Sequence, residues 1–283
     1  MGVSEAPVID AAVSAAAPSI VVDHLDVTYR LYADSQRRLR TLFIGQSSSR
    51  EYRAVEAVRD VSFMSYPGEA VGIIGHNGSG KSTLLRAIAG LLPIENGRVY
   101  ASSTPVLLGV SAALNKNISA RRNIYLGATA LGMPRDEVDE QFEEIVEFAG
   151  VEEFIDLPLR AFSSGMRSRL QFSIAAAVTP DILLIDEALS TGDAEFKERS
   201  DTRIRELIAE AGTVYIVSHS LKNITDVCDR ALWLDHGVLV ADGDPEQVVE
   251  AYEEHVKRLK AERKIRRRRA RAEAGLTEDD GEA

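Results

Sequence analysis

The sequence predicts an α/β fold with parallel strands at the centre of its sheet, and three observations carry this prediction. Apolar, β-branched runs at 70–74, 182–187 and 213–219 have the composition of strands that are buried on both faces. A glycine-rich stretch, residues 75–83, lies between the first of these runs and an expected helix. A helical block over roughly 119–162 separates earlier strands from later ones, which predicts an inserted helical lobe.

The composition is ordinary for a globular fold and argues against several classes of protein. The 283 residues are 45% hydrophobic and 27% charged, so they can bury a core without disulfides. Cys228 is the one cysteine, which excludes an internal disulfide; we expect it to be a small buried residue in a reducing compartment. The formal net charge of −11 argues against general affinity for nucleic acid. No apolar run reaches the roughly 18 residues that a membrane-spanning helix needs.

The first 18 residues are expected to form a disordered leader. They are rich in alanine and carry Glu5 and Asp10 but no Lys or Arg, so they lack the positive start of a secretory signal. Any membrane role is therefore expected to come through a partner chain or through surface contact.

Two strands are expected before the glycine-rich stretch. The β-branched segment 19–29 predicts the first, and 57–66, closed by Pro67 and Gly68, predicts the second. The interval from Arg30 to Glu56 is too long for a simple hairpin. It contains the basic segment 36–44, for which a solvated helix and docking on a membrane partner or lipid headgroups are the two alternatives.

Further elements are expected on either side of the helical block. Residues 97–100 and 105–109 predict short strands, and 231–242 predicts a hairpin that turns at His236 and Gly237. The last helix is expected to begin near Pro245, because Pro is favourable in a first turn.

The stretch from 75 to 83 fits the phosphate-binding pattern G-x-x-x-x-G-K-[ST] at every specified position. It comprises Gly75, His76, Asn77, Gly78, Ser79, Gly80, Lys81, Ser82 and Thr83. The glycines let the backbone turn tightly, so that successive N–H groups point at a polyphosphate near the positive end of the following helix. Lys81 is expected to reach the β- and γ-phosphates, and Ser82 to bind Mg²⁺. A bare glycine-rich turn is the alternative, and the strand–loop–helix context argues against it.

Asp186 and Glu187 form the second candidate group, because they end an apolar strand. Ligands of open α/β sheets collect at the carboxyl ends of strands, so Asp186 is expected to hold Mg²⁺ directly or through water. Glu187 is placed to polarise the attacking water. A helix-capping turn is the alternative interpretation of this acid pair.

A third segment, Phe162-Ser163-Ser164-Gly165-Met166, precedes an apolar helix and stands just upstream of the acid pair. Together with the phosphate-binding loop and the acids, it resembles the Leu-Ser-Gly-Gly-Gln signature of the nucleotide-binding subunits of ABC transporters. Ser163 and Gly165 keep the residues of that signature, and the other three positions depart from it. The resemblance spans about 19–254. It implies a P-loop NTPase with a mixed sheet, an antiparallel β subdomain and an inserted helical lobe at about 112–178.

The resemblance also implies how the site works. In that family two subunits pair head to tail, so each ATP would lie between Lys81 of one chain and Ser163 and Gly165 of the other. His219 ends the strand at 213–218 and stands where the family has its switch histidine, which contacts the γ-phosphate. ATP and Mg²⁺ are the implied cofactors, and Glu187 and His219 are the implied catalytic residues. A structural histidine is the alternative for His219.

Two departures from the family pattern stand in this sequence. Val110 occupies the position of the glutamine-loop residue, and no Gln occurs between residues 93 and 141. The long insert before Ala57 leaves the aromatic that stacks on adenine open between Tyr52, which has the usual spacing, and Tyr29.

The early insert, together with the segments 108–109, 122–126, 163–166 and 192–196, resembles the exporters of lipid-linked polysaccharides, such as O-antigen, teichoic acid or cell-wall galactan. The chain is similar to a short form without a C-terminal sugar-binding domain. This implies an ATP-hydrolysing homodimer, peripheral on the cytoplasmic face of the membrane, that works with separate transmembrane permease subunits and binds no nucleic acid. The alternative is a soluble ABC ATPase that acts on nucleic acid or ribosomes.

Residues 255–283 are expected to form a basic helix and an acidic tail. The segment 257–271 holds ten basic residues and one acid. A solvated helix and attraction to an anionic membrane leaflet are the two alternatives for this segment.

Overall fold

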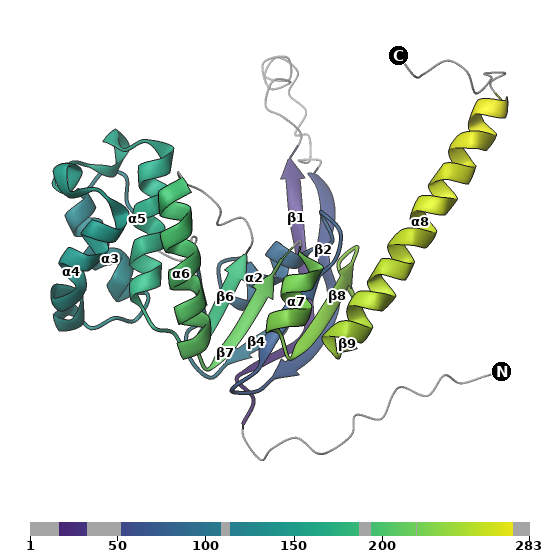
Figure 1. The fold of residues 1–283 in the computed structure, drawn as a ribbon, viewed down its shortest axis with the longest axis horizontal. Helices are drawn as coiled ribbons and strands as arrows, with labels where there is room; N and C mark the ends of the chain where they lie inside the picture. The colour runs from purple at the N-terminus through teal and green to yellow at the C-terminus, as the bar shows by residue number, and fades with distance from the viewer. Residues whose placement is uncertain (1–16, 33–51, 109–113, 187–193, 219, 274–283) are drawn as a thin grey trace, which may run out of the picture.

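The computed structural model describes residues 17–32, 52–108, 114–186, 194–218 and 220–273, and it confirms the predicted α/β fold with two sheets and a helical lobe (Figure 1). The larger sheet has six strands in the order β5-β6-β7-β3-β8-β9. Its strands are β3 (Ala70–Ile74), β5 (Val106–Leu107), β6 (Ile182–Asp186), β7 (Thr213–Val217), β8 (Arg230–Asp235) and β9 (Val238–Gly243). All neighbours pair in parallel except β8 and β9, so the sheet is mixed as predicted.

The smaller sheet is antiparallel, in the order β2-β1-β4, as the fold prediction also required. It contains β1 (Ile20–Tyr32), β2 (Tyr52–Ser65) and β4 (Asn96–Ala101). Strands β1 and β2 pair from Ile20 with Ser65 to Tyr32 with Tyr52, so both continue into the interval that we expected to be a connection. The expected basic segment at 36–44 lies outside the described residues.

Helix α2 (Lys81–Ile88) is packed between the two sheets. Its Leu84 and Leu85 are fully buried in a cluster with Val27 and Val61 of the antiparallel sheet and Ile73 of β3. Burial of this kind contributes about 1.5–3 kcal/mol for each large apolar side chain. The N-terminus of α2, where the candidate site lies, is therefore held against both sheets.

Helices also cover the face of the larger sheet that lies away from α2 (Figure 1). They include α6 (Ala194–Glu210), α7 (Leu221–Val227) and the 29-residue α8 (Pro245–Glu273). Phe196 and Leu207 of α6 pack on Leu183 of β6 and Val214 of β7. Helix α8 begins against β8, where Tyr252 contacts Trp233 edge to face at 5.6 Å, and its second half extends away from the sheet.

The helical lobe consists of α3 (Ala120–Ala130), α4 (Arg135–Ala149) and α5 (Ser164–Ala177), with short 3₁₀ turns at Glu152–Phe154 and Leu159–Ala161. The helix ends have identifiable causes. The Ser119 hydroxyl caps α3 by accepting a hydrogen bond from Arg122 N, and α4 stops at Gly150, whose φ of 62° is left-handed.

The described part of the chain contains no helix that is both long and apolar enough to span a bilayer.

Candidate nucleotide-binding site

The predicted phosphate-binding loop joins the end of β3 to the start of α2. Three of its glycines have positive φ, at 146° for Gly75, 81° for Gly78 and 107° for Gly80, a region that L side chains rarely adopt. The first backbone bond into the helix runs from Leu84 N to Gly80 O at 2.8 Å. The N–H groups of the preceding turn therefore lie at the positive end of α2, where anions bind.

The loop is also enclosed by neighbouring backbone. A Cβ on Gly80 would collide with the carbonyl oxygen of Ala57 in β2, and a Cβ on Gly75 with that of Leu234 in β8. A Cβ on Gly78 would meet nothing within 4 Å. The turn between β8 and β9 closes the loop from a further side, because Gly237 N donates to Ser79 O at 2.9 Å.

Lys81 carries the positive charge of the site. Its side chain is buried, and Nζ donates to the carbonyl oxygens of Gly75 at 2.8 Å and His76 at 3.0 Å. These two bonds hold the ammonium against the loop backbone, which offsets the cost of removing the charge from water. The loop, Lys81 and the N-terminus of α2 together fit the triphosphate of a nucleotide.

Other predicted residues of the loop differ in their surroundings. Asn77 and Gly78 are exposed, Ser82 is half-buried, and Ser79 is fully buried. Thr83 Oγ1 lies 3.3 Å from the hydroxyl of Tyr29 in β1. The structure thus brings Tyr29, one of the two aromatic candidates, to the first turn of α2. The side chain of Tyr52 lies outside the described residues.

Asp186 is the last residue of β6 and is 6% exposed. Side chains alternate along a strand, so Asp186 shares a face with Leu184, which packs in the same cluster as α2. The carboxylate is therefore on the side of the sheet where the loop and α2 lie. This placement fits the predicted role in Mg²⁺ binding. Glu187, His219 and Val110 lie outside the described residues.

Ser163 and Gly165 stand at the start of α5 in the helical lobe, apart from the loop (Figure 1). Ser163 is the N-cap of α5, and its Oγ accepts a hydrogen bond from Met166 N at 3.1 Å. Both residues are exposed, so this helix end is presented to solvent.

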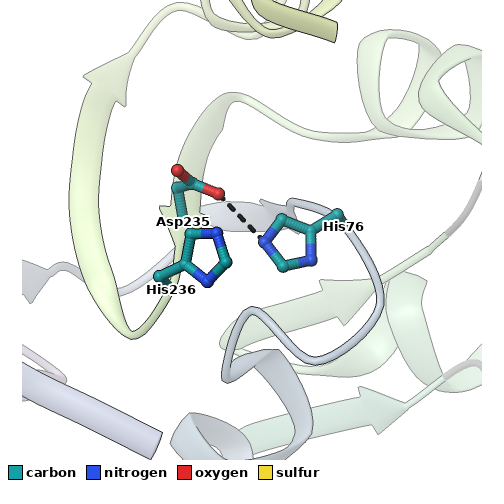
Figure 2. A group of neighbouring side chains, drawn as sticks. All are labelled: His76, Asp235 and His236. Carbon is teal, nitrogen blue, oxygen red and sulfur yellow. Dashed lines mark ion pairs between the residues drawn. The ribbon is translucent and has the colours of Figure 1, made fainter. Parts of the chain in front are cut away.

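Sequence reasoning missed a group of three side chains between the loop and the β8–β9 turn (Figure 2). His76 of the loop faces Asp235 and His236 at the turn between β8 and β9, and His76 Nε2 lies 3.0 Å from Asp235 Oδ1. The sequence predicted the turn at His236 and Gly237, but its contact with the loop depends on the order of strands in the sheet.

Comparison with known proteins identifies the family to which this fold and loop belong. The ABC transporter family profile matches residues 58–190. The teichoic acids export ATP-binding protein TagH of Shouchella clausii is 35% identical over 239 residues, which cover 84% of this chain and 66% of that protein. The O-antigen export system ATP-binding protein RfbB of Klebsiella pneumoniae is 36% identical over 244 residues, which cover 84% of this chain and 98% of that protein. The chain belongs to the ABC transporter family.

A solved structure agrees with this assignment at the level of the fold. The dimeric post-hydrolysis state of the ATP-binding cassette MJ0796, bound to ADP and Pi, superposes with a TM-score of 0.58 at 20% identity, covering 80% of this chain and 98% of that one. The relatives thus confirm the predicted family, and this structure confirms the predicted fold. The chain spans about two thirds of the length of the TagH relative.

Proposed function

We propose that the chain is the ATP-hydrolysing subunit of an exporter of lipid-linked polysaccharide. The observation that carries the proposal is the buried Lys81, held by two loop carbonyls at the N-terminus of α2, with Asp186 on the same side of the sheet. A glycine-rich loop with a lysine and a strand-end aspartate is the arrangement that phosphoryl-transfer enzymes use to position a nucleoside triphosphate and its metal.

The proposed roles divide among the residues as follows. Backbone N–H groups of the loop and the Lys81 ammonium bind the phosphates, and Ser82 and Asp186 hold Mg²⁺. Bound Mg²⁺ would neutralise charge on the phosphates. Glu187 orients and polarises the attacking water, and His219 contacts the γ-phosphate. Tyr29 or Tyr52 stacks on the adenine.

The proposed active unit is a homodimer, because Ser163 and Gly165 stand at the start of α5 in the helical lobe and not at the loop of their own chain. The exposed N-terminus of α5 offers a hydroxyl and a partial positive charge to a phosphate bound by a second copy. The MJ0796 cassette, which has a similar fold, is itself dimeric with ADP and Pi bound, and this supports the proposal.

The proposed substrate class and location follow from the relatives. The TagH and RfbB proteins are named as ATP-binding proteins of teichoic acid and O-antigen export. We infer that the chain works with separate transmembrane permease subunits, on the cytoplasmic face of the membrane, and that the permease carries the glycan. Co-purification of the tagged chain with a multi-spanning partner tests this assignment, and recovery of nucleic acid or ribosomes instead would contradict it.

The catalytic proposal is tested with Glu187→Gln. Removing the carboxylate that polarises water is expected to lower ATP turnover about 10²–10⁴-fold while leaving ATP binding intact. The variant should therefore accumulate as an ATP-bound dimer in gel filtration. Turnover at the wild-type rate would remove Glu187 from this role.

The contribution of the second copy is tested by adding Ser163→Ala to that variant. The matched control is Ser119→Ala, because Ser119 also caps a helix of the same lobe through its hydroxyl. Each change costs about 1 kcal/mol of helix capping, so both affect folding stability similarly. ATP-dependent dimerisation should be lost with Ser163→Ala and kept with Ser119→Ala. Equal dimerisation by the two would refute the head-to-tail arrangement.

A further inference from the structure

The group formed by His76, Asp235 and His236 has the composition of a metal site outside the expected Mg²⁺ ligands (Figure 2). One ligand atom from each residue lies within 4.8 Å of the others. The side chain of His76 is 37% exposed and that of Asp235 is 22% exposed, and His236 is exposed, so an ion can enter from solvent.

The tautomer of His76 follows from its neighbour. His76 Nδ1 lies 2.7 Å from the carbonyl oxygen of Asn77. A carbonyl oxygen can only accept a hydrogen bond, so Nδ1 carries a proton and donates it. This arrangement, in which one ring nitrogen donates to a backbone carbonyl and the other is directed elsewhere, is the usual one for a histidine that binds a metal.

The other nitrogen of His76 then faces a carboxylate. Nε2 lies 3.0 Å from Asp235 Oδ1, yet it is buried and has no aligned hydrogen-bond partner within the described ranges. A lone pair on Nε2 that faces a carboxylate oxygen is unfavourable unless a cation lies between them. A hydrogen bond from a protonated ring would satisfy the pair, but Nε2 and Oδ1 do not form one despite their short distance. A metal ion can accept both groups without that constraint.

His236 supplies the third ligand. Its ring centroid is 4.6 Å from that of His76, and its backbone is fixed by φ of 48° and by a hydrogen bond of 3.1 Å from Arg59 Nε to its carbonyl oxygen. A tetrahedral Zn²⁺ with ligands at about 2.0–2.1 Å sets neighbouring ligand atoms about 3.3 Å apart. Since the three ligand atoms already lie within 4.8 Å of one another, the exposed His236 side chain needs to move by roughly 1.5 Å at most to complete the tetrahedral ligand geometry.

The geometry points to a binding site for a divalent transition-metal cation of the Zn²⁺ type, formed by His76, Asp235 and His236. Two imidazoles and one carboxylate suit Zn²⁺ and disfavour Mg²⁺, which prefers oxygen ligands in octahedral geometry. The ion joins the phosphate-binding loop to the turn between β8 and β9, and it leaves a fourth position for water. Its occupation is expected to stabilise the loop in the nucleotide-free protein.

The test is a calorimetric titration of the whole 283-residue chain, tag-free and metal-stripped, with Zn²⁺ in the absence of nucleotide. The variants are His236→Asn and Asp235→Asn; Asn tolerates the positive φ at 236, so that variant retains the turn. The matched control is His24→Asn, because His24 has the same φ of 48° and lies 2.6 Å from Asp60. Wild type and control are expected to bind one Zn²⁺ per chain, and both site variants at least about tenfold more weakly.

A second readout does not depend on calorimetric heats. Ligands that bind the folded state raise the melting temperature, so Zn²⁺ should raise Tm of wild type and His24→Asn but not of His236→Asn. Millimolar Mg²⁺ should not displace the bound Zn²⁺. The proposal fails if wild type binds no stoichiometric Zn²⁺, or if His236→Asn binds it as tightly as wild type. If Asp235→Asn does not fold, His236→Asn alone decides the question.

Discussion

Replacing Gly80 by alanine should destabilise the protein more than the same change at Gly78, although both residues have positive φ in one loop. The left-handed region costs an alanine about 1–2 kcal/mol at either position. At Gly78 nothing lies within 4 Å of the new Cβ, so the cost ends there. At Gly80 the Cβ would collide with the carbonyl oxygen of Ala57 in β2, which cannot rotate away. Relieving that contact adds about 1–3 kcal/mol.

The assay is thermal unfolding of the nucleotide-free protein, followed by the fluorescence of Trp233, the one tryptophan of the chain, which is 6% exposed. For a chain of this size, a difference of about 1–3 kcal/mol corresponds to a Tm difference of roughly 2–12 °C. Gly80→Ala should melt below Gly78→Ala by that amount. Equal melting temperatures, or a lower one for Gly78→Ala, would refute the conclusion that β2 presses on this side of the loop.

Three further predictions concern other parts of the chain. Asn123 is fully buried; its side-chain amide donates to the carbonyl oxygens of residues 115, 118 and 119, and its Oδ1 accepts from the N–H of residue 115. Asn123→Ala should therefore lower the free energy of unfolding, measured by urea titration, by about 2–4 kcal/mol, whereas Asn117→Ala, at an exposed position, should lower it by less than about 0.5 kcal/mol. Burial raises the pKa of Cys228 to about 12, so the stability that its neutral thiol contributes is complete below about pH 8.5 and declines as the pH rises above that value. Above about pH 8.5, the Tm of wild type should fall more steeply with pH than the Tm of Cys228→Ala, and parallel slopes would contradict this. Truncation after Glu254 should reduce pelleting with anionic liposomes, at roughly 1 kcal/mol per basic residue near the surface, and equal pelleting would exclude membrane attraction by the basic helix.

The strands of the larger sheet were predictable because their environment is simple. Residues 70–74, 182–186 and 213–217 are buried on both faces, so a continuous apolar run indicates each strand with little ambiguity. The burial of Cys228 was predicted because a lone cysteine that forms no disulfide behaves as a small apolar residue, and it is confirmed at 8% exposure. The hairpin turn at His236 and Gly237 was also predictable, because Gly237 supplies the positive φ of 84° that a tight turn requires.

Other parts of the fold were not predictable because exposed charges hide them. Strand β2 was predicted from residue 57 onward, but it begins at Tyr52, and its first residues carry Arg53 and Glu56 at exposed positions, a pattern that also suits a connection. Helix α6 is rich in charged residues, and only a few apolar residues such as Phe196 and Leu207 hold it to the core, so its apolar stripe is narrow and hard to detect in the sequence. The roles of Glu187 and His219 stay predictions, since both lie outside the described residues.

Some residues of the phosphate-binding loop were predictable from the local sequence pattern, whereas the reasons for others depend on tertiary contacts. Gly75, Gly80 and Lys81 could be identified from spacing, because they occupy specified positions of the phosphate-binding pattern. The reason for Gly80 is different: the approach of β2 fixes it, and that approach depends on a strand more than twenty positions away. Contacts with β2, β8 and the β8–β9 turn, together with the core around α2, position the loop before any phosphate arrives. A loop so constrained loses little further conformational entropy when it binds an anion, and more of the charge attraction at Lys81 is therefore available as binding energy.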